Sequence, residues 1–273
     1  MKTAIVIVVS CLAGFTPYSK KNVITLTEKH KKVSLAGKAY NSSGFFKLDI
    51  KTGEKLGNIF SRTISYKSAD FPEIVYRAGG TGVYTVINND PSNPVFDGVF
   101  RYDGRPESHS KVEVSDNGKT VNYDGKSVTN TDGSGVIYNS LIWGTAPAKI
   151  HKGDSWKMNI SQAWELGGAG EQTITALDID AANHTIRLRR EGTGNGFYDN
   201  DLKQLNVAKD GKTTRMDVTP GFSHWVGFTT FKNGLVISDE LMVKRSVTLT
   251  SGDLKFTADQ REYILLNAMP VID

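Results

Sequence analysis

The sequence predicts an all-β protein, namely an antiparallel meander that forms a barrel or half-barrel, with a two-sheet β-sandwich as the alternative. From Val23 onward, apolar residues recur mostly at every second position, which is the period of a strand with one buried face. Three dipeptides that suit tight hairpin turns, Asn117-Gly118, Asp210-Gly211 and Asn233-Gly234, lie within this alternation. No stretch of ten or more residues has convincing amphipathic helical spacing. We therefore expect more than ten strands.

The first 19 residues have the pattern of a secretory signal peptide. A basic start, Met1-Lys2, precedes the apolar run Ala4–Val9, and the polar segment Ser19–Lys21 follows. The apolar stretch is too short to span a bilayer as a stable helix. We expect cleavage after residue 19 and an exported mature chain, secreted or periplasmic, with no transmembrane segment. The alternatives are a buried N-terminal strand and a lipid anchor at Cys11, which is the only cysteine.

Composition limits the classes of function. Lysine and arginine number 33 and aspartate and glutamate 29, with both signs interleaved along the chain, so we expect no nucleic-acid partner. A hydrophobic content of 38% is enough for a sizeable core and excludes global disorder. We expect an N-terminal β region over residues 20–130 and a C-terminal meander over residues 131–273. These two regions could also form one continuous barrel.

Each turn dipeptide sets a strand register that can be checked against the apolar pattern. A wrong register would scatter apolar residues over both faces of the hairpin. In all three hairpins, the expected pairs gather them on one face. The expected pairs are Val114–Val121 and Val112–Tyr123, Val207–Thr214 and Leu205–Met216, and Val226–Leu241 and His224–Val243.

Further strands are expected where β-branched or aromatic residues alternate with polar ones. Trp156, Met158 and Ile160 alternate with polar residues, and so do Ile186 and Leu188. The run from residue 83 to residue 87 is rich in β-branched and aromatic residues, which favour strands.

The C-terminal meander places polar residues on an otherwise apolar face. The turn at Asn233-Gly234 and a second one near residues 251–252 carry this face across three strands, which brings His224, Arg245, Gln260 and Glu262 onto it. Arg245 needs a partner, because an unpaired charge in an apolar interior costs several kcal/mol. Glu262 is the expected partner, and Gln260 is placed to assist. One interpretation is a structural salt bridge near the barrel mouth. The other is a ligand pocket in which Arg245 binds an anionic head group and His224 helps to orient it.

Other constellations carry weaker signals. The loop at residues 194–201 offers oxygen ligands for calcium but lacks the spacing of an EF-hand. Trp225 and Phe231 are expected on the outward face, where they could stack on sugar rings or cover a neighbouring strand. Trp164-Glu165 with Glu171 could supply a glycosidase carboxylate pair. The five histidines show no metal-ligand spacing, and no catalytic set stands out.

These observations together predict an exported, non-catalytic β protein that binds an amphipathic, lipid-like or anionic small molecule in an internal apolar cavity. The predicted ligand-binding residues are His224, Arg245, Gln260 and Glu262, with no metal and no cofactor. The alternatives are a surface carbohydrate-binding module or glycosidase, and a structural component of the cell envelope.

Overall fold

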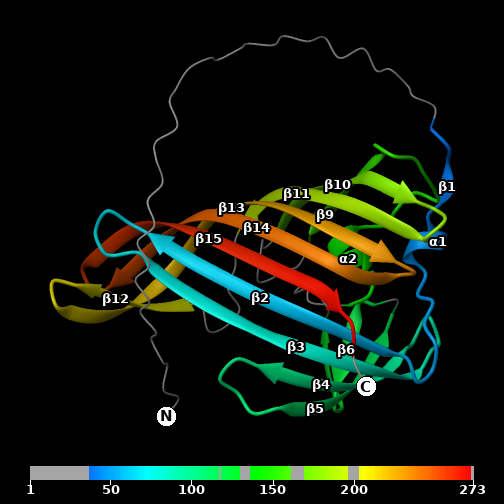
Figure 1. Ribbon diagram of the computed structural model, residues 1–273. Coiled ribbons are helices and arrows are strands. Elements are labelled where there is room, and N and C mark those ends of the chain that lie inside the picture. The colour runs from blue at the N-terminus through cyan, green and yellow to red at the C-terminus, as the bar shows by residue number, and fades with distance from the viewer. Residues whose placement is uncertain (1–36, 117, 130–135, 161–168, 196–202, 272–273) are drawn as a thin grey trace, which may run out of the picture. The chain divides into compact units, whose positions relative to one another are not determined.

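The described part of the chain is an antiparallel β structure with two short helices (Figure 1). The computed structural model describes residues 37–116, 118–129, 136–160, 169–195 and 203–271. The expected signal peptide, Cys11, Trp164-Glu165 and most of the candidate calcium loop lie outside the described residues. Gly37–Asp273 belong to one compact unit.

The first elements are β1 (Tyr40–Asn41), α1 (Ser43–Phe46), β2 (Lys55–Lys67), β3 (Ile74–Asn88), β4 (Val95–Tyr102), β5 (Ser108–Ser115), β6 (Thr120–Tyr123) and β7 (Lys126–Thr129). They are followed by α2 (Ser140–Trp143), β8 (Lys149–Ile150), β9 (Ser155–Ile160), β10 (Ala169–Asp180), β11 (Thr185–Asn195), β12 (Gln204–Lys209), β13 (Lys212–Lys232), β14 (Leu235–Ser251) and β15 (Leu254–Met269).

One large sheet holds nearly all of the strands. Its order is β7-β6-β5-β4-β3-β2-β15-β14-β13-β11-β10-β9, with β12 paired to β13 beside this path, and β1 and β8 form a separate small sheet. The C-terminal strand β15 pairs with β2, so the sheet joins the two ends of the described chain. The terminal strands β7 and β9 do not pair with each other, so the sheet is open, as in a half-barrel or a sandwich. The all-β prediction is confirmed.

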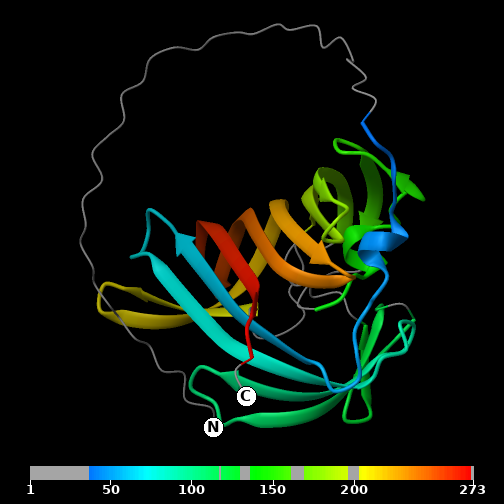
Figure 2. The ribbon, with the colours of Figure 1, turned by 45° about the vertical axis from the view of Figure 1, so that its right-hand side comes forward.

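The sheet is curved (Figure 2). Its inner face carries the buried apolar side chains of the core. In β2, the side chains of Phe60, Ile64 and Tyr66 face inward at every second position, and β3 and β15 continue this pattern. The two short helices add apolar side chains to the core, of which Phe45 and Trp143 are buried.

The first two predicted hairpins are confirmed. Val114 lies opposite Val121 on β5 and β6, and Leu205 lies opposite Met216 on β12 and β13. In the second hairpin, both residues of the Asp210-Gly211 turn have positive φ, as a type I′ turn requires. The β14–β15 pairing brings Arg245, Gln260 and Glu262 onto one face, as predicted, with Gln260 opposite Arg245.

The third hairpin departs from the prediction because of a β-bulge. Next to the turn, Phe231 lies opposite Val236, which is the predicted register, but the register shifts between Thr230 and Phe231. The extra residue in β14 reverses the alternation of β13 relative to β14. His224 therefore lies opposite Lys244 instead of Val243, and its side chain is exposed on the outer face.

The same bulge reverses the prediction for the aromatic residues of β13. Trp225 and Phe231 were expected to point outward, but they are 1% and 0% exposed on the inner face. A second shift between Pro220 and Ser223 changes the alternation again further along the strand. The predicted position of His224 beside Arg245 and the predicted outward position of both aromatic residues are therefore wrong.

Candidate functional site

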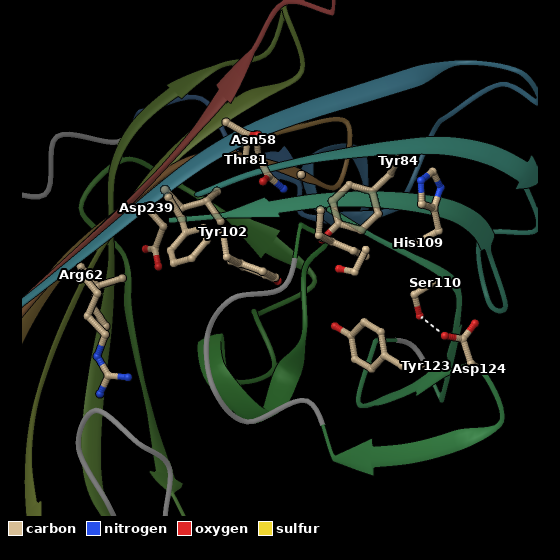
Figure 3. Close-up of a pocket in the computed structure, with 16 residues that line it drawn as sticks. Asn58, Arg62, Thr81, Tyr84, Tyr102, His109, Ser110, Tyr123, Asp124 and Asp239 are labelled. Carbon is tan, nitrogen blue, oxygen red and sulfur yellow. Dashed lines mark hydrogen bonds between the residues drawn. The ribbon is translucent and has the colours of Figure 1, made fainter. Parts of the chain in front are cut away.

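A cavity of about 520 Å³ opens on the concave face between the N-terminal strands and β14–β15 (Figure 3). Aromatic residues of β2, β3 and β4 form one wall, and polar residues of β5 and of the turn after β6 form the rim. The lining residues are Asn58, Phe60, Arg62, Thr81, Gly82, Tyr84, Phe100, Tyr102, Ser108, His109, Ser110, Tyr123, Asp124, Asp239, Ile264 and Leu266.

The aromatic wall is built from rings that lie over glycines. Phe60 lies opposite Gly80, and Gly80 lies opposite Tyr102. A Cβ atom at Gly80 would come within 2.9 Å of both rings, so the missing side chain leaves the space that they fill. The Phe60 and Tyr102 ring centroids are 5.5 Å apart in an edge-to-face arrangement, and those of Tyr84 and Phe100 are 5.4 Å apart. Such contacts hold the rings in place and leave an apolar surface toward the cavity.

Hydrogen bonds fix the polar rim. Asp124 accepts a hydrogen bond from the Ser110 hydroxyl at 2.8 Å and one from the Lys111 backbone N–H at 2.8 Å. The Ser110 bond and then the backbone bond lower the pKa of Asp124, because both favour the charged carboxylate. His109 contacts Glu107 at 3.1 Å at the edge of the rim. This end of the cavity therefore offers an exposed carboxylate and hydroxyl groups.

The other end of the cavity holds Arg62, the first member of a buried ionic chain. Glu262 Oε1 lies 2.6 Å from both Nε and Nη2 of Arg62. Glu262 Oε2 accepts a hydrogen bond from Arg245 Nη2 at 3.0 Å, and Arg245 Nη1 donates to the Ser223 hydroxyl at 3.3 Å. The side chains of Arg62, Glu262 and Arg245 are 19%, 1% and 0% exposed. Arg62 is thus the member of the chain that reaches the cavity.

A second buried network centres on Asp239, which also lines the cavity. Its carboxylate binds Arg190 Nη2 at 2.5 Å and accepts a hydrogen bond from the Thr229 hydroxyl at 2.6 Å. Thr229 in turn accepts a hydrogen bond from the Trp143 indole at 2.9 Å. Burial raises the pKa of Asp239, and the neighbouring Arg190 opposes that rise. Gly227 lies opposite Arg190, and a Cβ atom there would come within 2.9 Å of the guanidinium Nε, so glycine makes room for the arginine.

Three of the four predicted site residues lie together, and the fourth does not. Arg245, Gln260 and Glu262 are buried on the inner face, and the predicted Arg245–Glu262 ion pair is present. Gln260 donates a hydrogen bond to the Tyr66 hydroxyl at 2.9 Å. Burial, as the main cause, raises the pKa of Tyr66 to about 12. The three residues support the charged end of the cavity from behind and do not line it, while His224 lies on the outer face.

Sequence reasoning missed Arg62, Arg190 and Asp239. Each lies at an inward-facing position of a strand with alternating apolar residues. The sequence shows this for Arg62, which lies in the alternating series with Phe60 and Ile64. Arg190 likewise follows Ile186 and Leu188 at the same spacing. An arginine within such a series signals a buried ion pair, but its partner could not be identified, because Arg62 and Glu262 are 200 positions apart.

Trp225 belongs to the core on this same face. Its indole donates a hydrogen bond to Gln172 Oε1 at 2.7 Å, and Gln172 donates to the Ile142 carbonyl at 2.6 Å. Gly192 lies opposite Trp225, and the indole ring packs where a side chain at Gly192 would be. Trp225 is therefore not available for stacking on a sugar from solvent.

No protein-family model and no curated protein sequence matches this chain. Within the residues that the structure describes, no group of three or more histidine, cysteine, aspartate or glutamate side chains is arranged to hold a metal ion. No helix in the same residues is long and apolar enough to cross a bilayer.

Proposed function

We propose that this protein is an exported, non-catalytic binding protein whose concave cavity takes an amphipathic small molecule with an anionic group. The cavity volume of about 520 Å³ and its convergent aromatic and polar residues suit a small organic ligand. The proposal of export rests on the pattern of the first 19 residues.

A guanidinium group at one end of the cavity supports an anionic group on the ligand. Among the described residues, the two buried networks contain the guanidinium groups of Arg62, Arg190 and Arg245 and the carboxylates of Asp239 and Glu262. Arg62 is the only one of these three arginines that lines the cavity, so a ligand anion at this end would lie beside its guanidinium group.

The aromatic wall supports an apolar body for the ligand. Tyr84 and Tyr102 lie between the middle of the cavity and the rim, and Arg62 and Asp124 lie at its opposite ends (Figure 3). An amphipathic ligand would place its anionic group beside Arg62 and its apolar part along the rings. In this orientation the anionic group also lies far from the Asp124 carboxylate.

Two fluorescent probes test the proposal with the full chain. The anionic probe is 8-anilinonaphthalene-1-sulfonate, and its uncharged analogue is N-phenyl-1-naphthylamine. We expect both to bind. Arg62→Gln should weaken the sulfonate about tenfold, because one charge-assisted contact is worth about 1.5–3 kcal/mol, and should leave the uncharged probe unaffected. Equal losses for the two probes would overturn the proposed role of Arg62.

A matched pair of tyrosines tests the position of the ligand. Tyr102 in the cavity and Tyr263 on the outer face are 38% and 37% exposed. Tyr102→Ala should weaken both probes, while Tyr263→Ala should weaken neither. If the two variants lose binding equally, the probes bind elsewhere and the cavity proposal fails. As a separate measurement, native mass spectrometry of the protein purified from its own host would identify a natural ligand by its mass.

A carbohydrate is the second candidate ligand, because tyrosine rings and polar groups share the rim. Tyr102 and Tyr123 are both partly exposed, and Asn58 and Asp124 offer hydrogen-bonding groups. Stacking on aromatic rings together with hydrogen bonds suits a sugar. Glycan-array binding that is lost in Tyr102→Ala and Tyr123→Ala, without binding of either fluorescent probe, would favour this candidate over the first.

A further inference from the structure

The outer face of the sheet carries a row of basic side chains. His224, Lys244 and Arg261 lie directly opposite one another on β13, β14 and β15. All three are exposed, whereas the residues next to them along each strand are buried. We call these three residues the basic row.

An apolar row lies beside the basic row on the same face. Two positions along each strand, Val226, Met242 and Tyr263 again lie opposite one another. Met242 is 45% exposed, which is high for a large apolar side chain within a sheet. Exposed Phe222 lies on the other side of the basic row, where its ring packs edge-on against the His224 ring with centroids 5.3 Å apart.

The charge of the basic row is poorly compensated within the sheet. Lys244 lies opposite Arg261, and like charges in that position destabilise an antiparallel pair. The row ends at the uncharged residues Thr193 and Ser65. Among the described residues, the nearest acidic side chains on this face are Asp259, which lies opposite Ser246, and Glu191, which lies opposite Val226 and pairs with Arg189 at 2.7 Å. Glu240, further along β14, accepts a hydrogen bond from the Tyr263 hydroxyl at 3.0 Å. A negatively charged partner would therefore relieve repulsion that the sheet itself leaves in place.

We propose that the basic and apolar rows dock the protein on the surface of an anionic phospholipid membrane. Lipid phosphates attract lysine and arginine near the surface. Tyrosine and apolar side chains are favoured in the layer between head groups and acyl chains. A soluble polyanion would engage the basic row alone, whereas a membrane surface engages both rows. The combination therefore favours the membrane.

Vesicle co-sedimentation of the full chain tests this surface. The vesicles are pure phosphatidylcholine, or phosphatidylcholine with a one-third share of phosphatidylglycerol. We expect binding to the anionic vesicles only, and binding should weaken with added salt because salt screens exposed charges. Lys244→Gln/Arg261→Gln should lower the partition coefficient about fivefold per lost cation, hence about 25-fold in total. Residues 1–36 are common to all variants, so any contribution from them cancels in the comparison.

Three further variants make the test specific. Lys126→Gln/Lys149→Gln removes the same charge from β7 and β8 and should bind as the wild type does. Arg261→Lys keeps the charge and should also bind normally. Met242→Ser should lower vesicle binding but leave retention on a heparin column unchanged, because heparin offers charge without an apolar layer.

Several results would overturn the proposal. The basic row has no role in binding if the Lys244→Gln/Arg261→Gln variant binds anionic vesicles as tightly as the wild type does. The same conclusion follows if the wild type binds both kinds of vesicle equally. Heparin retention without vesicle binding would assign the surface to a soluble polyanion instead. Arg62→Gln should bind vesicles as the wild type does, so the outcome is separate from that of the cavity proposal.

Discussion

Replacing Glu262 with glutamine tests the ionic chain behind the cavity most directly. The Glu262 carboxylate is 1% exposed and lies between Arg62 and Arg245, with contacts of 2.6 Å and 3.0 Å. Glutamine has nearly the same shape, so the substitution removes the charge and leaves little or no cavity. The two guanidinium groups then lie close together without the anion between them.

The expected loss follows from the burial of the two arginines. Arg245 has no exposed side-chain surface, so it cannot turn toward water, and removing one partner of a buried ion pair costs about 3–5 kcal/mol. Arg62 is 19% exposed and can recover part of its hydration. We therefore expect the free energy of unfolding to fall by about 3–5 kcal/mol, with most of the loss due to Arg245.

Urea unfolding followed by far-ultraviolet circular dichroism measures this loss. The matched control is Glu171→Gln, which removes the same charge from an exposed pair with Lys157 at 2.7 Å. An exposed pair contributes about 0–1 kcal/mol, so the control should unfold close to the wild type. Equal losses in the two variants would refute the argument, because burial would then make no difference to the value of the charge.

Two further predictions concern packing and pH. Gly192→Ala should lower the free energy of unfolding by about 3 kcal/mol, because a Cβ atom there would lie 2.4 Å from the Trp225 ring. The control is Gly44→Ala, which should change the free energy of unfolding little because no atom lies within 4 Å of the new Cβ. Similar losses in the two variants would contradict the packing argument. Burial raises the pKa of Tyr66 to about 12 in the folded protein, against the ordinary tyrosine value of 10.0, so between these values the folded state keeps its proton while the unfolded state loses it. Stability should therefore fall as the pH rises from about 10 to about 12, by up to about 2–3 kcal/mol from this group. Urea titrations across this range should show a smaller fall in Tyr66→Phe, and an equal fall would mean that other groups cause it.

Local pattern was sufficient for the fold class and for two of the three predicted hairpin registers. Alternation with period two marks a strand with one buried face, and an Asn-Gly or Asp-Gly turn sets which residues lie opposite each other. Val114 and Leu205 accordingly face their predicted partners. The predicted ion pair of Arg245 and Glu262 also follows from one turn, because only 17 positions separate the two residues.

The β13–β14 bulge shows where local pattern failed. Both faces of β13 contain large apolar residues: Val226 and Phe228 on one, and Trp225 and Phe231 on the other. Which face of β13 turns toward the core depends on partners from other strands. Gly192 leaves room for the Trp225 ring, which completes the packing of the inner face. Alternation within β13 alone could not distinguish the two faces, so His224 was assigned to the wrong one.

The sequence by itself determined the strands, their turns and one buried ion pair, because these depend on residues that are close along the chain. Only the tertiary structure decided the cavity, the position of Arg62 beside Glu262 and the basic row on the outer face. These features arise where β2 pairs with β15 and where a bulge changes the alternation of β13 relative to β14. Contacts between distant strands depend on the packing of the whole sheet, and no local spacing encodes them.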